Sequence, residues 1–494
     1  DLQGDAGLRA DVAPAAARYA LLAGERALGL DTTKALTLLD RARALTAETD
    51  STFALVLLRW GDAAHQAGMM REGAQAVEKA ASNLKAQGDL ARAGEALTLL
   101  ASIQRRLGAP EALSTAQRAV ALLRSTPGVE LVAALAALAG LHYATGADEA
   151  AIQTAEEALG LADHLSLPTP GRALGFRGSA RCAMGDLGGL ADMERALELL
   201  IAAGRGTDAG VLQSNLALER AQLEGPVATL ANLEKAYAFA EARGLTETTW
   251  FAAAASINNL VMVGRFDEAI DQADVLLPLL RASGERLQVC HVLKAQTAAL
   301  AERGVDASSK ADEALQIAHD AHDPILLMYA AWGAARARVG VGNLDAAHDL
   351  LDEIAAAPIH HDSRYAEVVP VLMRSALALE DLDFVDRLSE GVPDTLPGQQ
   401  HALITVSAIQ AEAAGDHAKA ARLYADAATG WERFTNVLEQ AHALVGQGRC
   451  LALMGDGRAD QSLRAGRALF DRMGATPRVD ECDRLIAGAS GAAL

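Results

Sequence analysis

The stretch TWFAAAASINNLVMVGRFDEAIDQADVLLPLL, residues Thr249–Leu280, shows how this chain folds. Its first half places Ile257, Leu260 and Val261 at i, i+3 and i+4, the spacing of one apolar face of an α-helix. Gly264 follows directly, and glycine readily takes the left-handed conformation that is common at helix ends. The first half is therefore predicted to be a helix that ends at a glycine turn.

The second half of the same stretch predicts another helix that folds back on the first. Asp267 and Glu268 follow the glycine, and acidic side chains are favoured at the positive N-terminal end of a helix. Ala269, Ala273 and Leu276 come next, at helical spacing on one face. Because two of these three side chains are small, the two helices can lie close together. The unit is therefore a helix pair joined by a glycine turn.

Glycines at the same position, between two apolar helical patterns, recur along the whole chain. These marker glycines are Gly29, Gly68, Gly108, Gly146, Gly185, Gly225, Gly264, Gly304, Gly342, Gly415 and Gly455. They are 38–40 residues apart, except for one double interval in which the expected position falls on Asp381. A fixed period in this range is typical of helical-repeat solenoids. The sequence therefore predicts an all-α fold, a right-handed α-α superhelix of eleven or twelve helix pairs.

The residues that follow the marker glycines resemble the tetratricopeptide pattern. After Gly415, small residues stand at +5 and +12 (Ala420 and Ala427) and a large one stands at +9 (Tyr424). The turn glycine of a tetratricopeptide repeat is likewise followed by a small residue at +5. The period here is longer than the standard repeat of about 34 residues. We therefore expect tetratricopeptide-like units of about 40 residues with lengthened helices.

Two places interrupt this rhythm and suggest a division into three parts. Prolines are dense in 358–397, where the expected glycine is also absent, so this segment is predicted to be an irregular repeat or joint. Residues 1–357 form the main repeat array, and 398–494 form the terminal repeats and a capping helix. The capping helix is expected to be short, over Val479–Ile486, and followed by a tail of small residues.

Composition excludes several classes of function. The chain carries 64 acidic and 44 basic residues, and its net charge is −20. Since nucleic-acid binding needs a basic face and no cluster of Lys and Arg occurs, we expect no nucleic-acid partner for this segment. No apolar run is long enough to span a membrane, so no membrane partner is expected.

The cysteines and the start of the chain suggest where the protein resides. Cys182, Cys290, Cys450 and Cys482 are far apart and have no metal-ligand spacing. The first three lie in helical patterns and are expected to be buried free thiols, which is typical of a reduced, cytoplasmic protein. The chain begins with neither a methionine nor a signal-peptide pattern. We therefore expect it to be a piece of a larger protein.

Several longer stretches resemble the helical arms of large actinobacterial signalling proteins. The stretches are GRALGFRGSARCAMGDLGGLADMERALELL (Gly171–Leu200), FAEARGLTE (Phe239–Glu247), LYADAATGWERF (Leu423–Phe434), ALVGQGRCLALMGD (Ala443–Asp456) and LFDRMGATP (Leu469–Pro477). Those proteins are adenylate/guanylate cyclase-type regulators with a signal-transducing ATPase core. The LuxR-type ATP-dependent regulators, which carry a similar arm, are a close sister group.

This resemblance covers essentially all 494 residues but only the arm of such a regulator. It implies a cyclase homology domain and a phosphate-loop ATPase upstream in the parent protein. In the sister group it implies a DNA-binding helix-turn-helix downstream. The chain contains no G-x-x-x-x-G-K-[S/T] loop and no basic helix-turn-helix. No catalytic residue can therefore be transferred from the family, and no cofactor is expected.

The sequence offers little for catalysis. His360, His361 and Asp362 could suggest a metal site, but adjacent histidines on a loop rarely converge on one ion. His319 and His322 stand at the end of a predicted helix, where the helix dipole accounts for them. We therefore expect neither a metal site nor enzymatic activity in this chain.

Candidate binding residues come from the inner face of the first helix of each pair. In tetratricopeptide-like stacks, residues about ten, six and three before the turn glycine point into the concave groove. In the central repeats these positions and their neighbours carry amide, aromatic and charged groups, and aromatic and Arg side chains are frequent interface anchors. The candidates are Asn215, Glu219, Gln222, Trp250, Asn258, Lys294, Tyr329, Trp332 and Arg336.

The candidate residues have distinct expected roles. Glu219 and Asn258 could bind a peptide main chain, Lys294 and Arg336 its carboxylates, and Trp332 an apolar side chain. The competing interpretation is that the aromatic members, Trp332 among them, only fill the core between helices. The expected partner is a protein or peptide, or a small-molecule effector, in the concave groove.

The function that these observations favour is a non-catalytic recognition and regulatory arm of a larger cytosolic signalling protein. Such an arm would sense a ligand or partner and bias an attached ATPase or cyclase module. The alternative is a passive protein–protein interaction scaffold. A ligand-dependent change in the output of the parent protein would separate the two.

Overall fold

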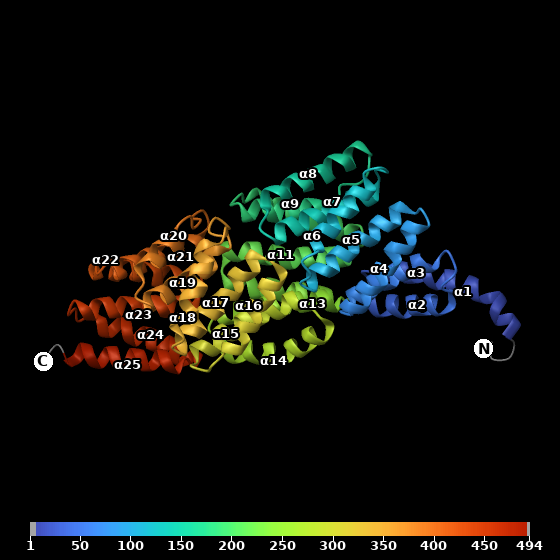
Figure 1. The fold of residues 1–494 in the computed structure, drawn as a ribbon. Helices are drawn as coiled ribbons and strands as arrows, with labels where there is room; N and C mark the ends of the chain where they lie inside the picture. Colours follow the sequence, from blue (N-terminus) through green and yellow to red (C-terminus); the bar gives the residue numbers. More distant parts are fainter. Residues whose placement is uncertain (1–5, 492–494) are drawn as a thin grey trace.

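The structure is a computed structural model that describes residues 6–491, with side chains placed for residues 12–488. Within this range the secondary structure consists of 25 α-helices, and no strand is present. The molecule is elongated, with α1 and α25 at opposite ends (Figure 1). None of these helices is long and apolar enough to cross a membrane. The predicted all-α fold is confirmed.

The helices follow one another with short turns. The first half of the chain contains α1 (Ala6–Ala27), α2 (Thr32–Leu45), α3 (Phe53–Gln66), α4 (Met70–Ala86), α5 (Leu90–Arg106), α6 (Ala112–Leu123), α7 (Val129–Ala144), α8 (Asp148–His164), α9 (Gly171–Ala183), α10 (Gly188–Ala202), α11 (Gly206–Glu224), α12 (Pro226–Glu241) and α13 (Thr246–Met262). The second half contains α14 (Phe266–Ser283), α15 (Arg286–Glu302), α16 (Ser308–Ala321), α17 (Pro324–Gly340), α18 (Leu344–Ala356), α19 (Tyr365–Ala378), α20 (Leu382–Ser389), α21 (Pro397–Ala413), α22 (His417–Arg433), α23 (Val437–Leu453), α24 (Ala459–Met473) and α25 (Thr476–Gly491).

Helices α1 to α24 form twelve pairs, and α25 closes the array as a single helix. In each pair we call the odd-numbered helix the inner helix and the even-numbered helix the outer helix. The expected number of pairs is confirmed. The expected capping helix, Val479–Ile486, was too short, because α25 runs from Thr476 to Gly491. The last residues of the expected tail, 492–494, lie outside the described residues.

The marker glycines end the inner helices. All eleven have φ between +68° and +85°. At Gly264 the amide N–H groups of Gly264 and Arg265 donate to the carbonyls of Val261 (3.0 Å) and Leu260 (2.9 Å). This pair of bonds satisfies carbonyls that a helix end leaves without partners. The glycine turn predicted from the sequence is therefore the actual end of each inner helix that a marker glycine follows.

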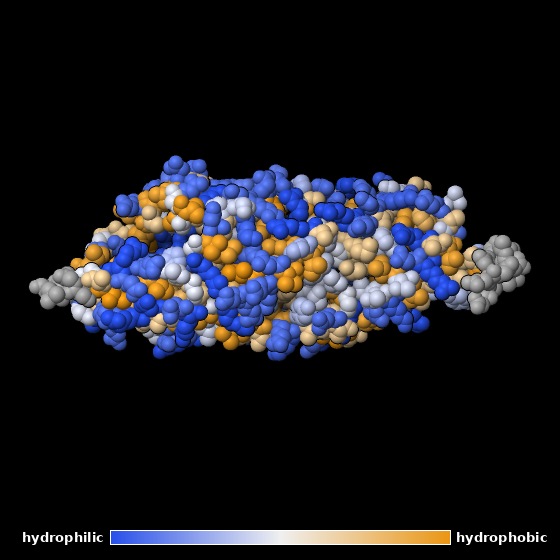
Figure 2. Space-filling view, turned by 90° about the horizontal axis from the view of Figure 1, so that it is seen from below, coloured by the Kyte–Doolittle hydropathy of each residue, from blue (hydrophilic) through white to orange (hydrophobic). Residues whose placement is uncertain are grey.

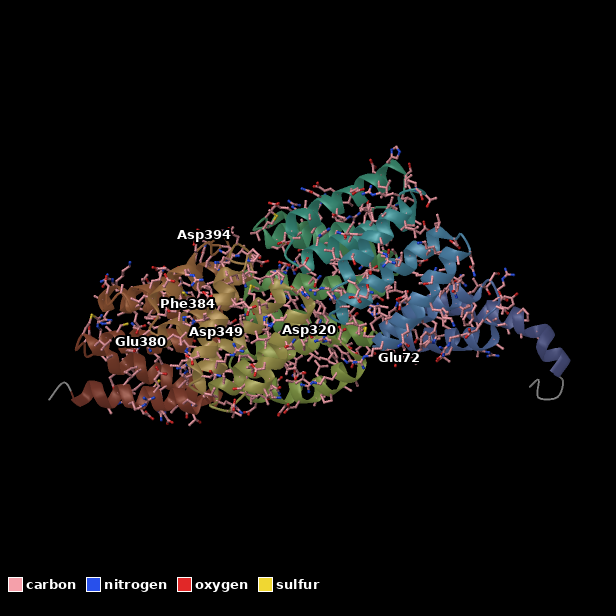
Figure 3. All side chains as sticks on the ribbon, in the orientation of Figure 1. Glu72, Asp320, Asp349, Glu380, Phe384 and Asp394 are labelled. Atoms are coloured by element: carbon pink, nitrogen blue, oxygen red, sulfur yellow. The ribbon has the colours of Figure 1, made fainter. Side chains whose placement is uncertain are left out.

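The missing marker is replaced by a residue with a side chain. Glu380 takes the left-handed conformation at the turn between α19 and α20, with φ +56° (Figure 3). Asp381, where the period placed the marker, instead caps α20 through its side chain, which accepts from the N–H groups of Asp383 and Phe384. Non-glycine residues pay a steric cost in this conformation. The period of the fold thus continues through the position where the glycine pattern stops.

Successive turns of the superhelix touch each other after five helix pairs. Helix α3 contacts α13, which in turn contacts α23, and α5 contacts α15, which contacts α25. A backbone hydrogen bond of 3.0 Å runs from the N–H of Thr32, at the start of α2, to the carbonyl of Arg243, between α12 and α13, and so joins two successive superhelical turns. The twelve pairs therefore wind through more than two turns of a closely wound superhelix.

The marker glycines are also the points at which these turns meet. A Cβ atom on Gly68 would lie 2.6 Å from the ring of Trp250, and one on Gly264 would lie 2.8 Å from Met473. Each marker from Gly29 to Gly304 has such a neighbour on a later part of the chain. A Cβ atom on Gly342, Gly415 or Gly455 would meet no atom of another described part of the chain within 4 Å. These three belong to the last pairs, for which no pair lies five positions further along.

The largest hydrophobic cluster extends from Ala254 to Cys482 without a break at the Pro-rich segment. Tyr365 in α19 and Phe384 in α20 belong to it, although α20 has only eight residues. Segment 358–397 thus contains a shortened helix pair that packs into the common core. The division of the chain at 357 and 398 stays a prediction. The face of the molecule seen in Figure 2 is mixed, with apolar residues in scattered groups among hydrophilic ones.

All four cysteines are free and buried, as expected for the three in helical patterns. Burial raises the pKa of the Cys182, Cys290 and Cys450 thiols to about 12 and that of Cys482 to about 11. At neutral pH these thiols are protonated and behave as small apolar side chains.

Substitution of two marker glycines should separate backbone strain from contact between superhelical turns. Gly415→Ala is expected to destabilise the protein by about 1–3 kcal/mol through the left-handed backbone alone. Gly264→Ala should lower the thermal unfolding midpoint further, because its Cβ also meets Met473. Gly457 has open space around it and no left-handed backbone, so Gly457→Ala is the matched control and should leave the midpoint unchanged. Equal midpoints for all three variants would contradict this account.

The small residues at +5 and +12 should limit how closely the helices of a pair can pack. Ala269 and Ala427 are fully buried. Ala269→Leu or Ala427→Leu is expected to overpack the pair at a cost of about 1–3 kcal/mol. Gln272→Leu, on the exposed face of α14, is the control. Denaturant midpoints close to wild type for both alanine variants would show that the pairs can separate to admit a larger side chain.

Candidate functional site

The inner side of the superhelix contains a partly open cavity of about 1110 Å³, which we call the channel. Its lining comes mostly from the inner helices, from α1 through α23, with a few residues from outer helices and turns. The outer helices cover the outside of each pair, so the inner helices are left with one face toward the axis of the superhelix. The channel is therefore a consequence of the winding described above.

One part of the channel wall is apolar. Helix α7 presents Val132, Ala133 and Ala136 to the channel, and the exposed side of Ala133 faces this interior space. Phe176 of α9 packs against Gly140 of α7, where a Cβ atom would lie 2.6 Å from the ring. The small residues of α7 thus leave room that larger side chains would fill.

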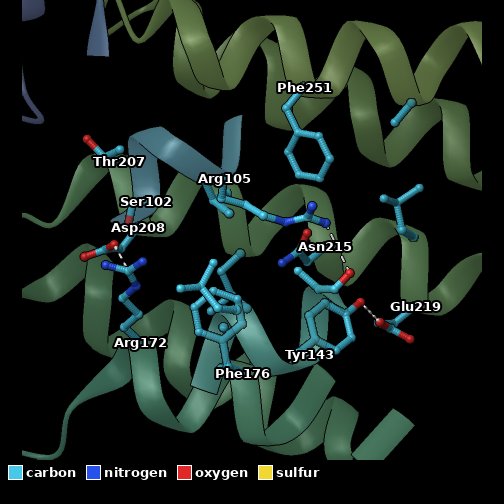
Figure 4. Close-up of a pocket in the computed structure, with 18 of the residues that line it drawn as sticks. Ser102, Arg105, Tyr143, Arg172, Phe176, Thr207, Asp208, Asn215, Glu219 and Phe251 are labelled. Atoms are coloured by element: carbon cyan, nitrogen blue, oxygen red, sulfur yellow. Dashed lines mark hydrogen bonds and ion pairs between the residues drawn. The ribbon is translucent and has the colours of Figure 1, made fainter. Parts of the chain in front are cut away.

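Arginines of α5 line the channel and pair with acidic residues of a later turn of the superhelix. Arg105 lies 2.7 Å from Asp323 at the start of α17 and donates to the carbonyl of Ala144 at 3.2 Å (Figure 4). Arg106 pairs with Glu247 and with Glu285, the latter at 3.4 Å. These ion pairs link inner helices that are far apart in the sequence.

Burial changes the protonation of this cluster. Glu285 is fully buried, and burial raises its pKa to about 8 although Arg106 acts in the opposite direction. Burial also acts to lower the pKa of Arg106, but Glu247 and Glu285 raise it above its ordinary value. The guanidinium therefore stays charged, while the Glu285 carboxyl holds a proton at neutral pH more readily than an exposed one.

Tyr143 and Glu219 form a second polar group in the channel. The Tyr143 hydroxyl donates to Oε1 of Glu219 at 2.5 Å (Figure 4). Burial raises the pKa of Glu219 to about 7, although Tyr143 and Arg364 lower it. The Arg364 guanidinium lies 5.2 Å from the centre of the Tyr143 ring, and it pairs with Asp362. Glu219 can therefore gain or lose a proton near neutral pH.

Lys294 is held inside the channel by aromatic and acidic neighbours. Its Nζ lies 3.9 Å from the centre of the Tyr329 ring and 3.9 Å from Glu367. Asn258 Nδ2 donates to the same carboxylate at 2.9 Å, which leaves Asn258 Oδ1 buried without a hydrogen-bond partner among the described residues. Burial lowers the pKa of Lys294, while Glu367 raises it. A cation on an aromatic face beside a carboxylate and an amide is a ready site for polar groups of a ligand.

Six of the nine predicted binding residues line the channel. They are Asn215, Glu219, Gln222, Asn258, Lys294 and Tyr329. The structure brings them together from α11, α13, α15 and α17, as the offset from the marker glycine predicts. Their role in binding stays a prediction.

The other three candidates lie outside the channel. Trp250 stands at the start of α13 and contacts the turn at Gly68, where successive superhelical turns meet. Trp332 is buried in the core, one helical turn from Tyr329. Arg336, a further turn along α17, faces a second cavity, and its Nε donates to Glu302 at 2.9 Å. The offset identified the inner face of these helices but not which part of that face borders the channel.

Several channel residues were missed in the sequence. Arg105, Tyr143 and Phe176 line the channel from earlier repeats. Arg105 and Tyr143 each stand three residues before a marker glycine, and Ser102 stands six before. The same offset, applied to the repeats before the central stretch, would have found these residues.

The histidines weighed as metal ligands have other contacts. The His360 ring stacks on Tyr365, with 4.8 Å between ring centres. His319 Nε2 lies 2.8 Å from Glu353 Oε1, and His322 ends α16 in the left-handed conformation. Within residues 6–491 no three His, Cys, Asp or Glu side chains are grouped as metal ligands.

The raised pKa of Glu219 should make stability depend on pH. In the unfolded chain this carboxyl loses its proton near 4.5, whereas in the folded protein it does so near 7. Between these values the folded state holds more protons, so the contribution of this group to stability falls as pH rises. Glu219→Gln cannot ionise. We therefore expect the thermal midpoint of this variant, relative to wild type, to increase from pH 5 to pH 8.

Asp148 is a second buried carboxyl near this group, and burial raises its pKa to about 7 as well. Its charge also raises the pKa of Glu219, so the two carboxyls titrate together. Comparing Glu219→Gln with wild type in an Asp148→Asn background therefore isolates the contribution of Glu219. A difference that stays constant from pH 5 to pH 8 would show that Glu219 is ionised in the folded protein over this range.

Comparison with known proteins supports the fold. No protein-family model and no curated protein matches the chain. Among solved structures, 134 chains match. One is the crystal structure of a Rap protein complexed with competence and sporulation factor, with a TM-score of 0.50 and 11% sequence identity. The match covers 73% of this chain and 99% of that chain. The likeness shows that this chain has the fold of a tetratricopeptide-like helical-repeat solenoid.

Proposed function

We propose that this chain is a non-catalytic recognition module that binds a peptide or a short segment of a protein in its channel. The observation that carries the proposal is the channel itself, about 1110 Å³ in volume and lined by inner helices from more than one superhelical turn. Binding pockets for small molecules are usually about 300–1,000 Å³. The channel therefore has room for a ligand of several residues, although a small-molecule effector would also fit.

The chemistry of the wall suits a peptide. Main-chain amides need both donors and acceptors, and Asn258 and Glu219 offer such groups inside the channel. Lys294 can pair with a carboxylate, since its own partner Glu367 lies at a distance of 3.9 Å. The apolar wall of α7 can accept an uncharged side chain, and the flexible ends of a peptide can follow the curved axis.

The fold offers further support. The similar Rap structure is a complex with a factor, which is an example of this fold in the bound state. Because identity to that protein is 11%, the comparison supports recognition in general and leaves the ligand open. The chemistry of the channel residues must therefore define the ligand of this chain.

In the parent protein we propose that binding regulates an attached module. The resemblance to the arms of cyclase-type regulators supports an ATPase or cyclase module upstream in a cytoplasmic protein. A ligand that contacts inner helices of successive turns would favour one spacing of those turns over another. The ligand would then bind one of the two spacings more tightly than the other. A difference in affinity between two conformations is what couples a binding site to a distant output.

The alternative is a passive scaffold that holds proteins together. Such a scaffold would use its outer surface or its ends, and filling the channel would not affect it. The two functions therefore make opposite predictions for a variant in which only the channel is blocked.

Ala133→Trp is designed to block the channel without disturbing the core, because Ala133 is exposed toward the channel interior. Peptides selected on the wild-type chain from a phage-displayed random library should lose at least ten-fold in affinity for this variant. Ala238→Trp places the same side chain on the exposed face of α12 and should bind like wild type. Fluorescence anisotropy with labelled peptides measures both.

Channel residues can then be tested individually. Asn258→Ala and Lys294→Ala should weaken the same peptides, since loss of a good anchor costs about 2 kcal/mol or more. Gln272→Ala on the outside of α14 is the control. If blocking the channel leaves peptide affinity intact while circular dichroism shows the fold preserved, the channel is not the binding site. The scaffold function would then be favoured.

A further inference from the structure

A second, smaller cavity lies inside the last superhelical turn. Its volume is about 300 Å³, and inner helices α17, α19, α21, α23 and α25 line it, together with residues of α22 and α24. An ion pair separates it from the channel: Glu439 lines the channel, Arg374 lines the smaller cavity, and their two bonds are 2.6 and 2.7 Å long. We call this space the arginine cavity.

Four arginines from four different helices converge on the arginine cavity. They are Arg336 of α17, Arg374 of α19, Arg449 of α23 and Arg478 of α25. This convergence stands out in a chain whose net charge is −20. Only two carboxylates, Glu412 and Glu481, belong to the lining itself.

Four carboxylates around the cavity balance the four guanidinium charges. Glu412 accepts from Arg449 at 2.6 and 2.9 Å, and Glu439 accepts from Arg374. Glu481 accepts from Arg478 Nη1 at 2.7 Å. Glu302 of α15 is not part of the lining, but its carboxylate accepts from several residues that are. Its oxygens lie 2.9 Å from Arg336 Nε, 3.0 Å from Arg478 Nε and 3.3 Å from His442 Nε2.

What remains in the cavity is a surplus of hydrogen-bond donors. Among the described residues, Nη1 and Nη2 of Arg336 and Nη2 of Arg478 have no hydrogen-bond partner. Burial lowers the pKa of Arg336, and Arg478 and Arg374 add to this effect, although Glu302 raises it. His442 has a pKa lowered to about 4 by burial, so it is neutral at pH 7. Arg336 and Arg478, which line the cavity, therefore keep donors without an acceptor.

We propose that the arginine cavity binds a small oxyanion of the phosphate class. A tetrahedral oxyanion presents several acceptor oxygens at once, and planar guanidinium groups bind such oxygens with good geometry. Arg336 and Arg478 are the primary ligands, because they have the free donors. Arg374 is held by two bonds to Glu439, and Arg449 by two bonds to Glu412 and one of 3.5 Å to Glu481, so neither is a primary ligand.

This site is distinct from the channel and does not depend on the function proposed for it. Bound anion would connect α17 with α25, which are joined at present through Glu302 alone in this cluster. Binding only to the folded state stabilises a protein in proportion to ligand concentration. The anion would therefore stabilise the last helix pairs and leave peptide binding in the channel to be measured separately.

Calorimetric titration of the full chain with inorganic phosphate tests the proposal, with sodium chloride at equal ionic strength as the reference. We expect saturable binding of one phosphate per chain and a higher thermal midpoint in phosphate than in chloride. A parallel titration with ribose 5-phosphate distinguishes the two sources of the group. Tighter binding of the sugar phosphate would identify an organic ligand, and equal or weaker binding would identify free phosphate.

Two variants locate the site. Arg336→Gln should reduce phosphate affinity at least ten-fold, whereas Arg281→Gln, which breaks an exposed pair with Glu313, should not change it. Val339→Phe fills part of the cavity and keeps every arginine, so it should also weaken binding. If Arg336→Gln loses its helical circular dichroism, Val339→Phe decides the question. Absence of saturable binding to wild type, or unchanged affinity in Val339→Phe, would overturn the proposal.

Discussion

The close approach of successive superhelical turns is the constraint on which the rest of the structure depends. The turns meet where the marker glycines lie against the starts of helices five pairs later, as Gly68 lies against Trp250. A larger residue at these points would meet both a left-handed backbone and a neighbouring turn. Because the approach is close, inner helices of successive turns line one common space. The result is a channel with walls from more than one turn.

Buried ion pairs add specificity to this winding. Arg106 pairs with Glu247 and Glu285, and Glu302 is shared by Arg336 and Arg478, so each cluster joins helices that are distant in sequence. Taking such groups out of water is costly, and the net stabilisation by each pair is small. These pairs fix how one superhelical turn is aligned with the next. If a turn were displaced by one helix, the charged groups would be buried without partners. The winding therefore has one well-satisfied arrangement.

The two cavities share helices, and this connects their chemistry. Helix α17 presents Tyr329 to the channel and Arg336 to the arginine cavity, with the buried Trp332 between them. The pair Arg374–Glu439 likewise has one partner on each side. A ligand that shifts α17 on one side would shift it on the other. The proposed anion site is thus placed where it could adjust how the channel holds a peptide.

The sequence alone predicted the helix pairs, their number as eleven or twelve, and their glycine turns, because these depend on local patterns: apolar spacing, a left-handed glycine and small residues such as Ala269. It also placed six of nine binding candidates on the channel wall, since the offset from the glycine fixes which helix face looks inward. Only the tertiary structure decided that the superhelix closes after five pairs. The winding results from the small rotations between successive pairs, and no local sequence pattern predicts their sum. Because of this winding, Trp250 lies at a contact between turns. The interior is also divided, so that Arg336 faces a separate cavity.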